Sequence, residues 1–344
     1  MKAVFPRQAF KILVSVIIFT VYISLFFAVS AQANHNHLIT SETLSDEPIQ
    51  PLHAHEDLDP EKITLGRRLF FDKRLSKDNS ISCSSCHNLA HGGTDNLPFS
   101  TGVNGTTGKI NTPTVYNTHL NLAQFWDGRA SNLIEQVSGP VENPLEMAAN
   151  WPDIIRKLDQ DRDFMRRYKK VYGNKLKADN LIDAIATFEK SLNTVNSPFD
   201  RFLAGDKNAI SAQAREGYQI FKSYGCTACH QGANVGGNMY QKMGVMADYF
   251  EERGTPITEA DLGRYNVTHD DYDKFTFKVP SLRLVVLTAP YFHDGSVSSL
   301  EQAINKMARY QLGREISAED VQKVITFLKT LVGEHKELTQ SAAE

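Results

Sequence analysis

The sequence predicts a mainly α-helical protein in which one small domain occurs twice in tandem. Two observations support this fold class: apolar residues recur at helical spacing in several segments, and a set of short motifs appears twice. In the last segment, Val321, Val324 and Leu328 recur at that spacing, and Glu319 and Asp320 enrich the first turn. We expect helices at 60–71, 151–172, 178–192, 211–223, 299–310 and 317–331.

The repeat extends over most of the chain. Gly66 to Phe70 and Gly217 to Phe221 share the pattern G-x-x-aliphatic-Phe. A longer series recurs at a constant offset of 280 − 113 = 167 residues: Pro113-Thr114-Val115, Phe125-Trp126-Asp127-Gly128 and Leu133 return as Pro280-Ser281-Leu282, Phe292-His293-Asp294-Gly295 and Leu300. Segment 197–206 has turn composition and suits a boundary. We therefore expect one domain at 34–200 and a second at 201–344.

The cysteines are confined to two motifs. All 4 lie in Cys83-Ser84-Ser85-Cys86-His87 or Cys226-Thr227-Ala228-Cys229-His230. Two thiols three positions apart can reach the vinyl groups on one edge of a porphyrin, and the histidine that follows can bind its iron. A zinc site or a redox dithiol would favour other patterns. The motifs predict two covalently bound haem c groups, with His87 and His230 as iron ligands, and leave no cysteine for a disulfide.

The first 33 residues have the organisation of an export signal. Lys2, Arg7 and Lys11 precede a long apolar stretch, and Ala31-Gln32-Ala33 is a small-x-small cleavage pattern. An uncleaved membrane anchor is the alternative, because the apolar stretch is long. Both predict a folded part in the periplasm. The net charge of −3 becomes −3 − 3 = −6 after cleavage, and no basic surface indicates nucleic acid.

The two repeats differ at a position that could supply a second ligand to a haem iron. Met307, on the helix expected after the Asp294-Gly295 turn, could supply a second iron ligand in domain two, although core packing is the commoner role of a methionine. The 167-residue offset places Pro140 opposite it in domain one. An iron with an open position activates small molecules, whereas one bound on both sides passes electrons. The rivals of Met307 are Met239, Met243 and Met246.

Domain one carries polar residues after its own turn. A carboxylate beside an open iron could move protons between the two oxygens of a peroxide. A solvated helix face would show the same composition. The four residues are Glu135, Gln136, Glu142 and Glu146.

Longer motifs resemble the bacterial di-haem cytochrome c peroxidases. The resemblance covers roughly residues 45–335 and rests on four stretches: Cys83 to Leu89, Gly92 to Pro98, Ala123 to Ala130 and Leu287 to His293. It implies two cytochrome c-like domains, with a low-potential peroxidatic haem in the first and a high-potential haem that receives electrons in the second.

The resemblance also implies roles for single residues. Met307 matches the distal methionine ligand, Glu146 the catalytic glutamate, Gln136 the glutamine of the peroxide pocket and Trp126 the tryptophan between the haems. Trp126 could equally be an aromatic core residue. Family members are commonly homodimers, and they hold a calcium ion between the domains through positions that match Asn111, Thr288 and Pro290.

One position departs from the family pattern. Many members have a histidine after the first haem that blocks the peroxide site in the oxidised enzyme, and the matching residue here is Val103. Valine cannot bind iron. His91 or His119 could replace the missing ligand, but His91 is too close to His87 and His119 suits a packing role. We expect the first haem to be open in the oxidised protein.

Three functions are compatible with these features. The first is an exported peroxidase that reduces hydrogen peroxide with electrons from a small cytochrome c or copper protein. The second is a relative that oxidises a protein partner, as do the enzymes that mature the tryptophan-derived cofactor of methylamine dehydrogenase; they lack the blocking histidine but carry tyrosine where Met307 stands. The third, a non-enzymatic electron carrier, leaves the acid residues beside an open haem unexplained. We favour the peroxidase.

Overall fold

The computed structural model describes residues 47–54 and 57–338, which belong to one compact unit of the chain that begins at Glu47. The predicted mainly helical class is confirmed, since 47% of the structure is helix and strands are few. The predicted export signal at 1–33 lies outside the described residues. Within the described residues, every helix is too short or too polar to span a bilayer.

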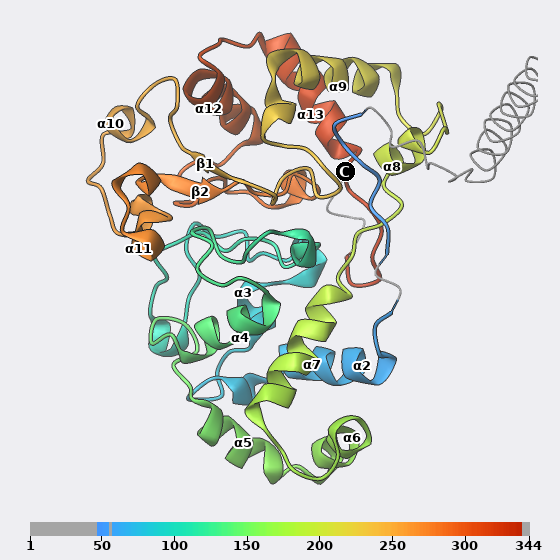
Figure 1. The fold of residues 1–344 in the computed structure, drawn as a ribbon, viewed down its shortest axis with the longest axis vertical. Coiled ribbons are helices and arrows are strands. Elements are labelled where there is room, and N and C mark those ends of the chain that lie inside the picture. Colours follow the sequence, from blue (N-terminus) through green and yellow to red (C-terminus); the bar gives the residue numbers. More distant parts are fainter. Residues whose placement is uncertain (1–46, 55–56, 339–344) are drawn as a thin grey trace, which may run out of the picture. The chain divides into compact units, whose positions relative to one another are not determined.

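The two halves of the chain are built on crossed helix pairs. In the first half, α2 (Pro60–Phe70) packs against α7 (Ala178–Lys190), and α3 (Cys83–Cys86) and α4 (Leu133–Glu142) lie between them in sequence. In the second half, α9 (Ala212–Tyr224) packs against α13 (Ala318–Lys329), and α12 (Leu300–Leu312) takes the place of α4 (Figure 1). Each helix pair encloses an apolar core.

Both crossings depend on a glycine. A Cβ atom on Gly66 would lie 1.9 Å from the carbonyl oxygen of Ala184, and one on Gly217 would lie 1.9 Å from that of Lys323. Since no side chain fits in this space, the repeated G-x-x-aliphatic-Phe pattern marks the two points where backbones touch.

The 167-residue offset also holds in three dimensions. Gln124 bridges to Ala130 in the first half, and Tyr291 bridges to Val297 in the second. The phenylalanine after each first bridge residue has a left-handed backbone, with φ of 68° at Phe125 and 69° at Phe292. Two non-glycine residues in this strained region at equivalent positions show that both turns have the same conformation.

Other segments differ from the prediction. The single helix expected at 151–172 is wrong: α5 (Trp151–Asp159) ends before Asp161, whose carboxylate accepts hydrogen bonds from two backbone amides and starts α6 (Arg162–Tyr172). The second half instead contains α10 (Tyr249–Arg253), α11 (Tyr265–Thr268) and the antiparallel strands β1 (Tyr240–Lys242) and β2 (Thr276–Lys278), which were not predicted.

The expected boundary at 197–206 is more ordered than its composition indicated. It contains α8 (Pro198–Leu203), capped reciprocally by Ser197 and Asp200. The chain also crosses between the halves at both ends. Ile49 packs in the core of α9 and α13, and Leu338 packs in a core that includes Phe70 of α2.

The glycine contact of the second pair leads to the first prediction. Gly217→Ala should lower the free energy of unfolding by about 3 kcal/mol, because the new methyl group overlaps the backbone of Lys323. The measurement is thermal or denaturant unfolding of the haem-loaded protein.

Gly205→Ala serves as the control. Gly205 has φ of 108°, and a Cβ atom on it would have no neighbour within 4 Å, so the substitution should cost only the backbone strain of about 1–2 kcal/mol. Equal losses in the two variants would contradict the close-contact explanation.

Candidate active site

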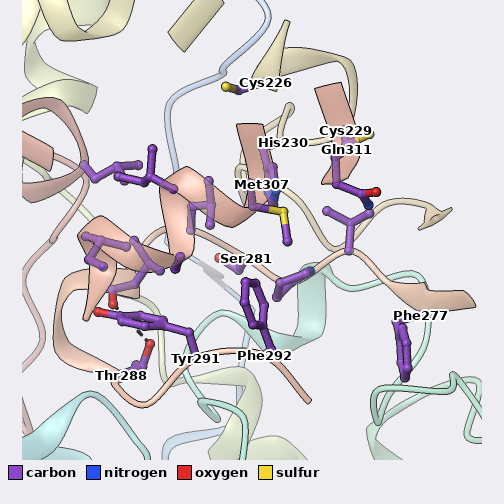
Figure 2. A pocket seen from close by; sticks show the side chains of 18 of the residues that line it. Cys226, Cys229, His230, Phe277, Ser281, Thr288, Tyr291, Phe292, Met307 and Gln311 are labelled. Carbon is purple, nitrogen blue, oxygen red and sulfur yellow. Dashed lines mark hydrogen bonds between the residues drawn. The ribbon is translucent and has the colours of Figure 1, made fainter. Parts of the chain in front are cut away.

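Each predicted haem motif lies beside a cavity. One cavity, here called the His87 cavity, has a volume of about 230 Å³ and is lined by Cys86 and His87. The other, the His230 cavity, has a volume of about 380 Å³ and is lined by Cys226, Cys229 and His230 (Figure 2). Cys83 lies outside the lining and packs against the neighbouring apolar cores. All four thiols are free, so they remain available for thioether bonds.

The histidines of both motifs are half-buried, and a backbone carbonyl orients the ring of His87. His87 follows α3 and its Nδ1 lies 3.1 Å from the carbonyl oxygen of Gly93, which leaves Nε2 as the nitrogen for a metal. Burial lowers the pKa of His87 and lowers that of His230 to about 4. Both rings are therefore neutral at pH 7, which is the form that binds iron.

A buried cation supports the fit of haem to the larger cavity. The side chain of Lys278, on β2, lines the His230 cavity and is 8% exposed. No described residue forms a hydrogen bond or an ion pair with its ammonium group, and burial lowers its pKa to about 8. A buried charge requires a counter-charge. The propionates of a haem would supply one.

The four polar residues predicted around α4 separate into two pairs. Gln136 and Glu146 line the His87 cavity, whereas Glu135 and Glu142 are exposed to solvent. Burial is the largest effect on Glu146 and raises its pKa, although Arg129 and a 2.7 Å hydrogen bond from the side-chain amide of Asn143 oppose the shift. Of these four residues, the structure thus brings one carboxyl and one amide to the cavity and orients the carboxyl.

The loop of Val103 is fixed beside Glu146. Val103 is 2% exposed and does not line the cavity, and its amide donates a 2.9 Å hydrogen bond to the carbonyl of Glu146. The hydroxyl of Thr106 donates to the carbonyl of Leu145 at 3.0 Å. Neither His91 nor His119 lines the cavity, and among its described lining residues His87 is the sole histidine.

The methionine candidates of the second half also separate. Met307, on α12, lines the His230 cavity, and Figure 2 shows its side chain projecting into this space. Met243 lines the cavity as well and is 8% exposed. Met246 is exposed, and Met239 is not a lining residue. The three residues expected to hold calcium line this cavity together: Asn111, Thr288 and Pro290.

The two cavities meet at the Phe125-Trp126 turn. Phe125 lines the His87 cavity and Trp126 lines the His230 cavity. Trp126 accepts a 2.8 Å hydrogen bond at its carbonyl from the amide of Lys278, and Asn111 donates a 2.7 Å hydrogen bond from its amide to the carbonyl of His293. Because 126 + 167 = 293 and 111 + 167 = 278, the two bonds are equivalent in the repeat. The indole nitrogen of Trp126 donates to the carbonyl of Asn111 at 2.9 Å.

A buried ionic network lies next to this turn and was missed by sequence reasoning. His293 Nε2 is 2.7 Å from Asp261, and Arg253 forms ion pairs of 2.7 Å with Asp261 and 2.9 Å with Asp294. Asp261, His293 and Asp294 are close enough to hold a metal, but the guanidinium of Arg253 already forms an ion pair with each of the two carboxylates. One feature of the sequence could have pointed to this network: the repeat places His293, an ionisable residue, where the first half has Trp126.

Comparison with known proteins gives the family. The model of the di-haem cytochrome c peroxidase family matches residues 60–208. The cytochrome c551 peroxidase of Nitrosomonas europaea is 48% identical over 291 residues, which cover 84% of this chain and 85% of that protein. The chain belongs to the di-haem cytochrome c peroxidase family. It is an oxidoreductase of the cytochrome c peroxidase class, and haem c is the cofactor that membership implies.

Two further comparisons differ in coverage and identity. The cytochrome c peroxidase Ccp of Escherichia coli K12 is 47% identical over 290 residues, 84% of this chain, but the match spans only 62% of that protein. A crystal structure of a MauG-like protein associated with microbial copper homeostasis superposes with a TM-score of 0.72 at 23% identity, covering 88% of this chain and 98% of that one. That likeness shows the fold.

The buried network leads to the second prediction. Burial opposes ionisation of Asp261, but hydrogen bonds from Arg253 and His293 hold its pKa far below the usual range. Asp261→Asn should therefore lower the free energy of unfolding by about 3 kcal/mol at pH 7, because Arg253 loses its buried partner. Denaturant unfolding of the haem-loaded protein measures this loss.

The pH dependence has a defined sign. A carboxyl with a depressed folded-state pKa stabilises the fold above its unfolded pKa of about 4, and this stabilisation is lost as the pH falls. The gap between variant and wild type should narrow below pH 4. Asp271→Asn, in an exposed pair with Lys274, should change stability little at any pH. A gap that stays constant down to pH 3 would argue against this assignment.

Proposed function

We propose that this protein reduces hydrogen peroxide to two waters, with two electrons and two protons, at the His87 cavity. One observation carries the proposal: Glu146 and Gln136 reach this cavity, while His87 is the sole histidine and no methionine occurs among its described lining residues. A haem bound through Cys83, Cys86 and His87 would then keep one side of its iron open beside an acid and an amide.

The second haem serves as the relay. It would be held by Cys226, Cys229 and His230, with Met307 as the second iron ligand. We propose that residues 34–200 and 201–344 form two cytochrome c-like domains with one haem each. When bound, the haem irons supply the electrons that the reaction consumes. Trp126, on the wall of the His230 cavity directly after Phe125 of the His87 cavity, lies on the electron path between them.

Proton transfer is the task of the protein side chains. Glu146 takes a proton from the oxygen of peroxide nearer the iron and returns it to the farther oxygen, so that water leaves. Its raised pKa suits this exchange near neutral pH, and Asn143 fixes the direction of its carboxyl. Gln136 holds the peroxide by hydrogen bonding from α4.

Family membership also supports proposals for the electron donor, the oligomeric state and a calcium ion. A small exported cytochrome c or a copper protein delivers electrons to the second haem in the periplasm, and the protein acts as a homodimer. Calcium is held between the domains by oxygens of Asn111, Thr288 and Pro290. All three line the His230 cavity, and they come from both halves of the repeat, which supports a bridging ion.

A protein-oxidising role of the cofactor-maturation type is the second candidate. The absence of a histidine at Val103 favours it. Met307 opposes it. Relatives with 47% and 48% identity are named peroxidases, whereas the methylamine utilization protein MauG of Methylorubrum extorquens is 32% identical.

The acid–base assignment gives the third prediction. Glu146→Gln should lower kcat for peroxide by about 10²–10⁴-fold, because the amide cannot carry the proton. The matched control is Glu142→Gln, an exposed position of α4, which should retain turnover. The measurement is steady-state oxidation of reduced cytochrome c, with haem content checked by absorbance. Unchanged turnover in Glu146→Gln would refute the assignment.

The Val103 loop gives the fourth prediction. The fully oxidised protein should contain a high-spin ferric component, because the lining residues offer no second ligand opposite His87. Electron paramagnetic resonance and the visible spectrum report the spin state. Peroxide turnover should then begin without prior half-reduction, and a purely low-spin spectrum would contradict an open site.

A further inference from the structure

We propose that two buried ionisable side chains of opposite sign, Glu189 in the His87 cavity and Lys278 in the His230 cavity, hold the reduction potential of the first haem below that of the second. The inference rests on the proposed function, since it concerns the same two haems, and it names residues that no catalytic step uses. Each side chain lines its own cavity, is more than nine-tenths buried and lacks a counter-charge among the described residues.

Glu189 is an isolated carboxyl in the first cavity. It lies near the end of α7, is 6% exposed, and its buried Oε2 has no hydrogen-bond partner among the described residues. Burial alone raises its pKa to about 8. An unpartnered buried carboxyl is costly to a fold. A group kept at such a cost calls for an explanation, and its position on the wall of a haem cavity provides one.

The repeat shows which residue of the second half corresponds to Glu189. Gly66 touches Ala184 and Phe188 of α7, and Gly217 touches Lys323 and Phe327 of α13. These contacts align α7 with α13 at an offset of 323 − 184 = 139 residues, which places Leu328 opposite Glu189.

Leu328 lines the His230 cavity. The same point of the wall is therefore a carboxyl beside the reactive haem and an apolar side chain beside the relay haem.

Lys278 differs from its counterpart in the opposite sense. The 167-residue offset pairs it with Asn111, and the equivalent backbone hydrogen bonds of these two residues, to Trp126 and His293, confirm the alignment. The second cavity thus has an ammonium group where the first half has a neutral amide. It would neutralise a haem propionate at that wall.

Both differences widen the gap between the two reduction potentials: one lowers the potential of the first haem, and the other raises that of the second. Burial alone keeps the Glu189 carboxyl largely protonated at pH 7. The positive charge that a haem gains on oxidation would favour the ionised form of this carboxyl, and the carboxylate in turn would stabilise the ferric form and lower the potential. The ammonium group of Lys278 would raise the potential of the haem beside it. Low dielectric in a buried site strengthens both effects. Electrons entering at the second haem then remain there until peroxide withdraws them through the first.

The experiment is spectroelectrochemical titration of each haem in the haem-loaded full chain. Glu189→Leu, which copies the second half, should raise the midpoint potential of the first haem and leave the second unchanged. Lys278→Asn, which copies the first half, should lower that of the second haem and leave the first unchanged. Glu189→Gln should shift the first haem in the same direction as Glu189→Leu, which separates loss of charge from loss of shape.

Matched surface variants control for general effects. Glu142→Gln on α4 and Lys242→Asn on β1 remove the same charges at exposed positions, and neither potential should move. Unchanged potentials in both buried variants, or shifts equal to those of the controls, would overturn the proposal. Peroxide turnover is scored separately: a wild type that lacks it refutes the proposed function, whereas the potentials test the charges alone.

Discussion

Two backbone hydrogen bonds hold the halves of this molecule in register. The amide of Lys278 donates to the carbonyl of Trp126, and the amide of Asn111 donates to the carbonyl of His293. Each half therefore supplies the donor for the turn of the other, so neither turn is complete without its partner. Since these turns also form walls of the cavities, the two hydrogen bonds fix the position of one cavity relative to the other.

On this shared frame the two sites diverge through single side chains. The backbone keeps its glycine contact, its bridge and its left-handed phenylalanine in both halves. Pro140 stands opposite Met307, and Glu189 stands opposite Leu328. Under the proposed function, the first change removes a soft iron ligand and the second adds a carboxyl, so the same architecture would give an open site in one half and a closed relay in the other. The repeat supplies a common geometry, and single substitutions distinguish the two cavities.

Local signals could be predicted from the sequence, and long-range ones could not. The spacing of Cys83, Cys86 and His87 is enough to predict that two thiols and one imidazole can reach the same haem. The repeat offset predicted which turns would match. The sequence did not separate Glu146 from Glu142, because burial depends on where α4 ends and on the loop that returns to it. The break before Asp161 was missed because helical periodicity continues through it. The partners in the Arg253 network come from distant segments, which no local pattern connects.

The valine at 103 alters the first site in two ways that reinforce each other. It removes the imidazole that would bind the iron, and it supplies an apolar side chain that is 2% exposed in the loop docked beside Glu146. Burying a valine contributes about 1.5–3 kcal/mol, whereas a histidine in the same place would require a hydrogen-bond partner for its ring. The substitution therefore favours the docked loop over one that swings onto the iron. Under the proposed function, fixing this loop benefits the first site, because the amide of Val103 holds the backbone of Glu146 while Asn143 holds its carboxyl.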